Sequence, residues 1–242
     1  MLTVMSFNTQ HCMNYITQKI DYDVMTDAIR TCGADIVGLQ EMRDEGDCSD
    51  FEPQARILAE KLGYSYYYFA KAIDVGGNDY NRPYGNALIS KYPILSAETV
   101  AIPVPKVRAY EETLFAYEDR CLLKATVDVS GDVLTVLVSH FGLYPDESER
   151  AVNTVLANLS PAKTVVMGDF NLQPDDALLL PIREKLFDTA ELFDEPKFSH
   201  PSDAPTVKID YLFTTRDINV LEADIPAIVA SDHRPYTAVI EW

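Results

Sequence analysis

Short apolar segments recur along the whole chain, and each has the length and the side-chain types of a β-strand. They predict strands over residues 2–7, 35–39, 64–70, 86–90, 122–129, 133–138, 163–168, 207–213 and 236–241. Other segments carry apolar residues at helical spacing and predict helices over residues 21–32, 53–62 and 147–159. Gly33 and Gly63 directly follow the first two of these segments, which is typical of a helix C-terminus.

The order of these segments favours mixed strand pairing over a purely parallel sheet. Only Ser130-Gly131-Asp132 separates the strands over 122–129 and 133–138, which indicates an antiparallel hairpin. The predicted helices are too few to connect every pair of neighbouring strands in parallel. We therefore expect antiparallel-rich sheets covered by helices, an α/β protein in which residues 1–242 form one domain.

The composition is that of a folded, acidic protein. The chain of 242 residues has 38 acidic and 20 basic residues, so its formal net charge is −18 at pH 7. A hydrophobic content of 47% excludes a disordered acidic tail. The negative charge argues against tight nonspecific binding to nucleic acid, which depends on clustered lysine and arginine. It leaves room for a local phosphate site.

Several sequence features that the chain lacks determine which compartment and partners we expect. No apolar run approaches the ~18–20 residues of a membrane span, so no transmembrane segment is expected. The N-terminal segment reads as a strand and lacks the features of a secretory signal, so we expect a cytoplasmic protein, or a secreted one if a leader has been removed. The four cysteines are scattered and predict neither a zinc site nor a disulfide framework. No obligate protein partner is predicted.

Polar side chains stand at the ends of six predicted strands. They are Asn8, Glu41, His140, Asp169 with Asn171, Asp210, and Asp232 with His233. Such groups on a rigid sheet can converge in one site. Singly, Asn8 and Asp169 are also common turn formers, and Glu41 suits a solvated loop. Asp210 is different, because a carboxylate inside an apolar strand is costly unless it is paired or bound to a metal.

Together these residue types favour hydrolytic chemistry on a phosphate ester. Carboxylate and amide oxygens suit Mg²⁺, or Mn²⁺, better than zinc. An aspartate–histidine pair suits activation of water, with the aspartate fixing the imidazole tautomer. The chain has no P-loop, no nucleophile elbow and no dinucleotide-binding fingerprint, so the nucleotide-motor, serine-hydrolase and dinucleotide classes lack support.

Eight stretches, in the same order from end to end, resemble the endonuclease/exonuclease/phosphatase superfamily. They are SFNTQH at 6–11, DIVGLQE at 35–41, GNALISKYPI at 85–94, DRCLL at 119–123, SHFGL at 139–143, GDFN at 168–171, KIDYLF at 208–213 and SDHRP at 231–235. The resemblance covers nearly the whole chain. It implies a four-layer αββα sandwich, in which two mixed β-sheets pack face to face with helices outside.

The resemblance also implies a role for each residue. The expected metal ligands are Glu41 as the principal one, with Asn8 and Asp232. The expected catalytic residues are His233, oriented by Asp210, together with Asp169, Asn171 and His140. Asn171, His140, Arg120 and His200 are the expected substrate-binding residues. Water would attack phosphorus in line, and whether His233 or Asp169 takes its proton is left open.

Two local features bear on the branch of the family and on its metals. Some family nucleases carry an acidic residue just after the first stretch, where this chain has Thr9 and Gln10, which weakens a second metal site. The stretch FSHPSDAP at 198–205 resembles the bacterial phosphoesterase and sphingomyelinase-like branch. His200 in that stretch either borders the pocket or is a turn residue held by Pro201.

Basic and aromatic residues in the predicted loops indicate which class of substrate the site can bind. Basic residues expected near the site suffice for one or two phosphates but are few for a duplex; they are Arg82, Lys106, Arg108, Arg120, Lys208 and Arg234. Aromatic residues at 103–118, including Tyr110, Phe115 and Tyr117, suit an aromatic rim or plain packing. We expect a metal-dependent phosphohydrolase acting on a small-molecule or lipid-head-group phosphoester. The alternatives are a nuclease of the same fold and a noncatalytic phosphate-binding module.

Overall fold

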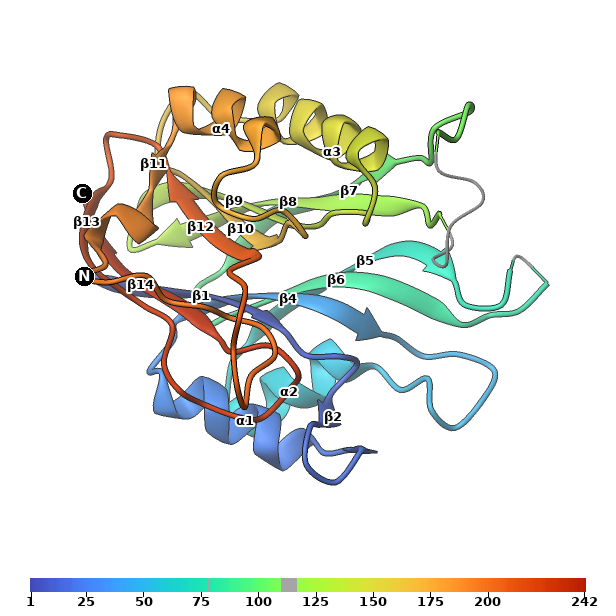
Figure 1. The fold of residues 1–242 in the computed structure, drawn as a ribbon. Coiled ribbons are helices and arrows are strands. Elements are labelled where there is room, and N and C mark those ends of the chain that lie inside the picture. Colours follow the sequence, from blue (N-terminus) through green and yellow to red (C-terminus); the bar gives the residue numbers. More distant parts are fainter. Residues whose placement is uncertain (78, 110–116) are drawn as a thin grey trace.

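The computed structural model describes residues 1–77, 79–109 and 117–242, and contains two six-stranded β-sheets (Figure 1). In the first sheet the strands run in the order β13 (Asn219–Asp224), β14 (Tyr236–Glu241), β1 (Leu2–Asn8), β4 (Ile36–Arg43), β6 (Pro83–Ser90) and β5 (Tyr66–Asp74). Strands β1 and β4 are parallel, and every other neighbouring pair in this sheet is antiparallel.

The second sheet repeats this mixture. Its strands run in the order β11 (Phe187–Asp188), β12 (Asp210–Thr214), β10 (Thr164–Asp169), β9 (Asp132–His140), β8 (Arg120–Val129) and β7 (Ile94–Ile102). Only β9 and β10 are parallel among its neighbouring pairs. The predicted hairpin is confirmed, because β8 and β9 pair antiparallel around Ser130 and Gly131. A small hairpin of β2 (Met13–Asn14) and β3 (Lys19–Ile20) lies outside both sheets.

Helices cover the outer face of each sheet, so the molecule has four layers (Figure 1). Helices α1 (Tyr22–Thr31) and α2 (Gln54–Leu62) lie on the first sheet. Helices α3 (Pro145–Ala157) and α4 (Leu180–Lys185) lie on the second, beside the 3-10 turns η1 (Ala177–Leu179) and η2 (Thr189–Leu192). The expected αββα sandwich of two mixed sheets is thus confirmed. None of the helices in the described ranges has the length and apolarity required to cross a bilayer.

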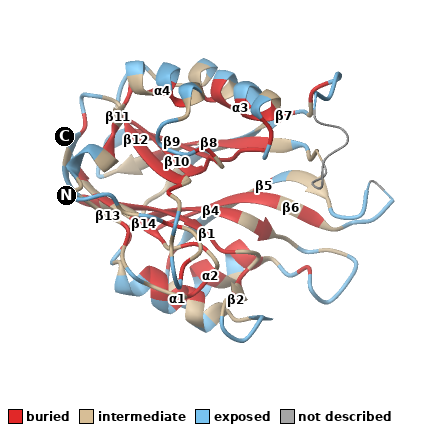
Figure 2. Cartoon of the chain, in the orientation of Figure 1, coloured by how far each residue is buried: buried red, intermediate tan, exposed pale blue. Residues whose placement is uncertain are grey.

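Three apolar clusters hold the layers together, and Figure 2 shows the strands buried between helices. One cluster joins the two sheets and includes Val4, Leu88 and Val136. A second lies between the first sheet and helices α1 and α2, and a third between the second sheet and helices α3 and α4. Because both faces of each sheet are covered, the central strands read in the sequence as continuous apolar runs.

The helix ends follow the local sequence signals. Asp21 precedes α1, and its carboxylate accepts hydrogen bonds from the backbone N–H groups of Asp23 and Val24. Gly63 ends α2 with φ of 73°, a left-handed conformation that glycine adopts without steric cost. The predicted helix over 147–159 begins two residues earlier, at Pro145, whose fixed φ suits the first turn.

Some strands differ from the prediction. Strands β7 and β13 were not predicted, because they lie at sheet edges and Ile102 is their only fully buried residue. The strand predicted at 207–213 begins only at Asp210, since Val207 instead forms an isolated bridge with His200. Strand β5 is displaced towards the C-terminus, and its Tyr66 and Tyr67 face solvent.

Candidate active site

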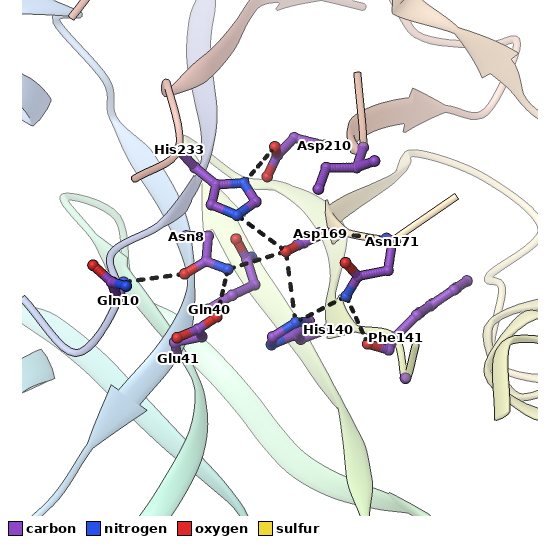
Figure 3. Close-up of polar contacts among 12 residues, drawn as sticks. Asn8, Gln10, Gln40, Glu41, His140, Phe141, Asp169, Asn171, Asp210 and His233 are labelled. Atoms are coloured by element: carbon purple, nitrogen blue, oxygen red, sulfur yellow. Dashed lines mark hydrogen bonds and ion pairs between the residues drawn. The ribbon is translucent and has the colours of Figure 1, made fainter. Parts of the chain in front are cut away.

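The two parallel strand pairs bring the expected residues to one edge of the sandwich (Figure 3). Asn8 and Glu41 lie at the carboxyl ends of β1 and β4 in the first sheet, and His140 and Asp169 end β9 and β10 in the second. The side-chain amide of Asn8 joins them, because Nδ2 is 3.0 Å from Oε1 of Glu41 and 3.0 Å from Oδ2 of Asp169. The site therefore spans both sheets.

A buried aspartate–histidine pair forms the second part of the site. Asp210 begins β12 directly opposite Asp169 in β10, so the two carboxylates are neighbours. Oδ2 of Asp210 is 2.8 Å from Nδ1 of His233, and the other ring nitrogen, Nε2, is 3.6 Å from Oδ2 of Asp169. All three side chains are buried. The Asp210 contact thus fixes the imidazole ring with Nε2 directed at Asp169.

The pKa values of His233 and Asp169 are both raised above their usual range. For His233, burial alone would lower the pKa, but Asp210 and Asp169 outweigh it and raise the value to about 10. For Asp169, burial raises the pKa to about 7, with His233 opposing the increase and Asp210 adding to it. The imidazole therefore favours its charged form while Asp169 can hold or release a proton near neutral pH.

His140 has the opposite character, and its ring is neutral. Burial lowers its pKa well below the usual range, and the neighbouring Arg120 and His233 lower it further. Nη1 of Arg120 is 3.4 Å from Nδ1 of this ring. Nε2 faces Oδ2 of Asp169 at 3.5 Å and lies 3.2 Å from the side-chain amide of Asn171.

Glu41 has the surroundings expected of a cation ligand. Its side chain is partly buried, and its pKa is raised by burial of the carboxylate, lowered by the Asn8 hydrogen bond and raised again by Asp232. Among the described residues it forms no ion pair with lysine or arginine. A buried carboxylate next to a second carboxylate is costly unless a cation compensates it, so the donor set of Glu41, Asp232 and the Asn8 amide fits Mg²⁺ or Mn²⁺.

The remaining expected residues lie beside this centre. Ligand atoms of His200, Asp232 and His233 all lie within 4.8 Å of one another, and the rings of His200 and His233 are 4.7 Å apart. Asp232 also accepts a hydrogen bond from Oγ of Ser231 at 2.9 Å. His200 therefore borders the site and also belongs to the turn before Lys208, so both sequence interpretations hold for its position; its role stays a prediction.

The basic residues are distributed differently from the expectation. Arg120 lies in the site and also pairs with Glu118 at 3.2 Å. Lys208 lies outside the site, because its Nζ donates to the backbone carbonyl of Asp210 and its side chain lines a separate cavity. Arg82 pairs with Asp47, and Arg234 donates to the carbonyl of Ser202. Of the expected aromatic rim, Tyr110 and Phe115 lie outside the described residues.

Two contributors to the site have no clear sequence signal. The backbone N–H of Gln10 donates to Oδ1 of Asn8 at 3.1 Å and so orients the amide of Asn8. Gln10, His11 and Cys12 are three consecutive non-glycine residues with positive φ, and no glycine marks this turn in the sequence. Tyr84 on β6 is partly buried beside Glu41, and burial of its hydroxyl together with that carboxylate raises the pKa of the hydroxyl.

Comparisons with known proteins agree with the fold and the positions of these stretches. The S. pombe protein cwh43 is 30% identical over 146 residues, which is 59% of this chain but only 13% of that protein's length. An endonuclease/exonuclease/phosphatase from Beutenbergia cavernae has a TM-score of 0.78 at 22% identity, with 99% of this chain and 71% of that chain covered. The Bacteroides thetaiotaomicron mannosyl-6-phosphatase Bt3783 has a TM-score of 0.76 at 16% identity, and both chains are covered completely, 100% of each.

The model of one family matches residues 5–233, from within β1 to the histidine of the buried pair, and so includes every stretch assembled at the site except the last two residues of SDHRP. Because this match covers most of the sequence, the chain belongs to the Endonuclease/Exonuclease/phosphatase family.

Proposed function

We propose that this chain is a metal-dependent phosphoester hydrolase that cleaves its substrate by in-line attack of water. The observation that carries the proposal is the cluster in which Oδ2 of Asp169 lies between the Asn8 amide and Nε2 of both histidines. Buried polar groups converging from two sheets cost folding free energy, and such a cluster is typical of a catalytic site.

Each side chain has a task in this proposal. Asp169 is the proton acceptor for the attacking water, because a pKa of about 7 suits a general base at neutral pH. His233, held in its charged form by Asp210, donates from Nε2 to a phosphate oxygen. His140 and Asn171 position the phosphate from the opposite side, and Arg120 adds positive charge there.

A divalent cation would be held by Glu41, with Asn8 and Asp232. When bound, it would stabilise the negative charge that develops on the phosphate oxygens. Nδ2 of Asn8 donates to the Glu41 carboxylate and Oδ1 of Asn8 accepts from the backbone N–H of Gln10, so the chain already holds both side chains in place at β1 and β4. That arrangement limits the reorganisation that binding requires.

The substrate class follows from the charge. A net charge of −18 opposes an extended polyanion, whereas Arg120 and two histidines suffice for a single phosphate group. We therefore propose a phosphodiester or phosphomonoester of a small molecule or of a lipid head group. The name of the structurally similar mannosyl-6-phosphatase supports this choice over a nuclease.

A substrate panel tests the proposal. It contains bis-p-nitrophenyl phosphate, a sugar phosphate, sphingomyelin, and single- and double-stranded DNA, each with Mg²⁺ and with Mn²⁺. We expect turnover of at least one small or lipid ester, and loss of about 10²- to 10⁴-fold of that rate in His233→Ala. Preferential cleavage of DNA would instead assign a nuclease, and no metal-dependent turnover of any substrate would assign a phosphate-binding module.

A further inference from the structure

A buried lysine outside the active site has no function in the proposed hydrolysis. Lys208 is 4% exposed and lies two residues before Asp210, the first residue of β12. Its Nζ donates to the backbone carbonyl of Asp210 at 3.0 Å. The same nitrogen lies 3.3 Å from the ring centre of Tyr211 and 5.4 Å from that of Tyr236. The amine thus holds the backbone of the residue that orients His233.

This amine lacks a counter-ion. Among the described residues no carboxylate oxygen lies within ion-pair distance of Nζ; the facing carboxylate of Asp188 is taken up by Arg183, at 3.1 Å. The charged and titratable groups around the amine are Arg183 on α4, Asp188 on β11, Asp210 and Tyr211 on β12, and Tyr236 on β14. Burial lowers the pKa of Lys208 to about 7, although Asp188 and Asp210 raise it.

Lys208 also lines a cavity of about 290 Å³. Apolar walls are provided by Pro174, Phe193, Pro196 and Phe198. The charged residues Arg183, Lys197, Asp188, Asp194 and Glu195 border the same space, and both cations already pair with carboxylates, Arg183 with Asp188 and Lys197 with Asp224. None of the residues assembled at the active site lines this cavity, which therefore offers a small molecule a separate route to the amine.

We propose that Lys208 is a covalent modification site for small acyl phosphates and that its acylation weakens the hold on Asp210. The neutral Nζ attacks the carbonyl carbon of the acyl phosphate. A C–N amide bond forms, and the bond between the carbonyl carbon and the bridging oxygen of the phosphate breaks. Phosphate leaves with that electron pair, and the proton from nitrogen passes to solvent. The resulting amide carries no charge and adds an acyl group against the face of Tyr211, next to the Asp210 carbonyl.

The modification would act on the proposed hydrolase through the buried pair. Displacing Nζ from the Asp210 carbonyl shifts the start of β12, and with it the carboxylate whose contact of 2.8 Å fixes the His233 ring. Lys208 is a positioning residue in this scheme, because it touches neither substrate nor metal. This effect rests on the proposed function, whereas the reactivity of the amine does not.

Acetyl phosphate at pH 7.5 tests the amine directly, with site-resolved mass spectrometry over time. The exposed Lys19 on β3 is the internal reference. Because the neutral fraction of an ordinary lysine is about 10⁻³ at this pH, we expect Lys208 to be acetylated at least about tenfold faster than Lys19. Acetylation of Lys19 with no modification of Lys208 would overturn the proposal.

Two further readouts separate this proposal from the proposed function. Acetylation should shift the imidazole NMR signals of His233, which requires no phosphoester turnover, and a complete acetylation of Lys208 without a shift would contradict the coupling to Asp210. In an active preparation, the rate of phosphoester hydrolysis should decrease in proportion to the acetylated fraction of Lys208. The hydrolysis rate of Lys208→Arg should not change on the same treatment. Equal losses in both proteins would assign the inhibition to other lysines.

Discussion

At the scale of single residues, the environment assigns different protonation states to chemically similar groups. His233 lies between two carboxylates and has a raised pKa, whereas His140 lies beside Arg120 and has a lowered one. The two imidazoles flank the same oxygen of Asp169, at 3.6 and 3.5 Å. One ring therefore favours its charged form and the other its neutral form, a division that depends on neighbours rather than on residue type.

Asp210→Asn tests the orienting role of this carboxylate. The amide keeps the size of the side chain but removes the charge that favours the His233 cation and fixes its tautomer. We expect kcat for the best phosphoester to fall by about 10²- to 10⁴-fold, with an unchanged circular dichroism spectrum. An unchanged kcat would remove Asp210 from the catalytic pair.

Lys208→Met tests the charge state of the buried amine through stability. The folded protein holds Lys208 with a pKa of about 7, and the unfolded chain has the ordinary value of 10.5. Between these pH values the unfolded state binds the extra proton, so this lysine contributes stability that rises with pH. We measure the free energy of unfolding in urea with EDTA from pH 7 to 10. The difference between wild type and Lys208→Met should change in favour of the wild type by about 1.4 kcal/mol for each pH unit. Parallel curves would contradict the lowered pKa.

At the scale of helices and strands, the site depends on how the strands end. The parallel pairs β1–β4 and β9–β10 direct their carboxyl ends to the same edge, and β12 begins there because it runs antiparallel to β10. This explains why polar residues at strand ends in the sequence predicted the site. Asn8, Glu41, His140, Asp169 and Asp210 were all predicted from that pattern.

The pattern of apolar and polar residues in the sequence did not predict other parts of the fold and the site. Strand β13 has no fully buried residue, so its sequence carries no apolar signal. Tyr84 reaches Glu41 only through the pairing of β4 with β6, which a single sequence does not specify. Lys208 was expected near phosphate, but it lies before β12 begins, and its amine donates to the Asp210 carbonyl and lines a different cavity.

Gly168→Ala tests the close approach that places Asp169. An added Cβ at Gly168 would lie 1.9 Å from the carbonyl oxygen of Ser139 on the neighbouring strand β9. Because backbone atoms must move, we expect a loss of roughly 2–4 kcal/mol in the free energy of unfolding. Gly33→Ala is the matched control, since its Cβ meets no atom within 4 Å and its φ of 64° predicts a loss of only about 1 kcal/mol. Equal losses in urea unfolding would contradict the packing argument.

At the scale of the whole molecule, the negative charge and the site have separate consequences. The four layers bury Asp169 and Asp210 at one edge, with Glu41 partly buried beside them. Most other acidic side chains are exposed or partly exposed and form a surface that repels polyanions. Buried carboxylates need a compensating cation, whereas exposed carboxylates restrict which substrates approach. We therefore propose that hydrolysis and metal binding depend on the same carboxylate, that of Glu41.

The most direct measurement is the metal dependence of phosphoester hydrolysis in the wild type and in Glu41→Gln. After EDTA treatment, the wild-type rate should fall to the uncatalysed background and return when Mg²⁺ or Mn²⁺ is added. Glu41→Gln should need at least about tenfold more metal for half-maximal activity and should remain about 10²-fold slower at saturation. Hydrolysis that survives EDTA, or the same metal dependence in both proteins, would contradict the account.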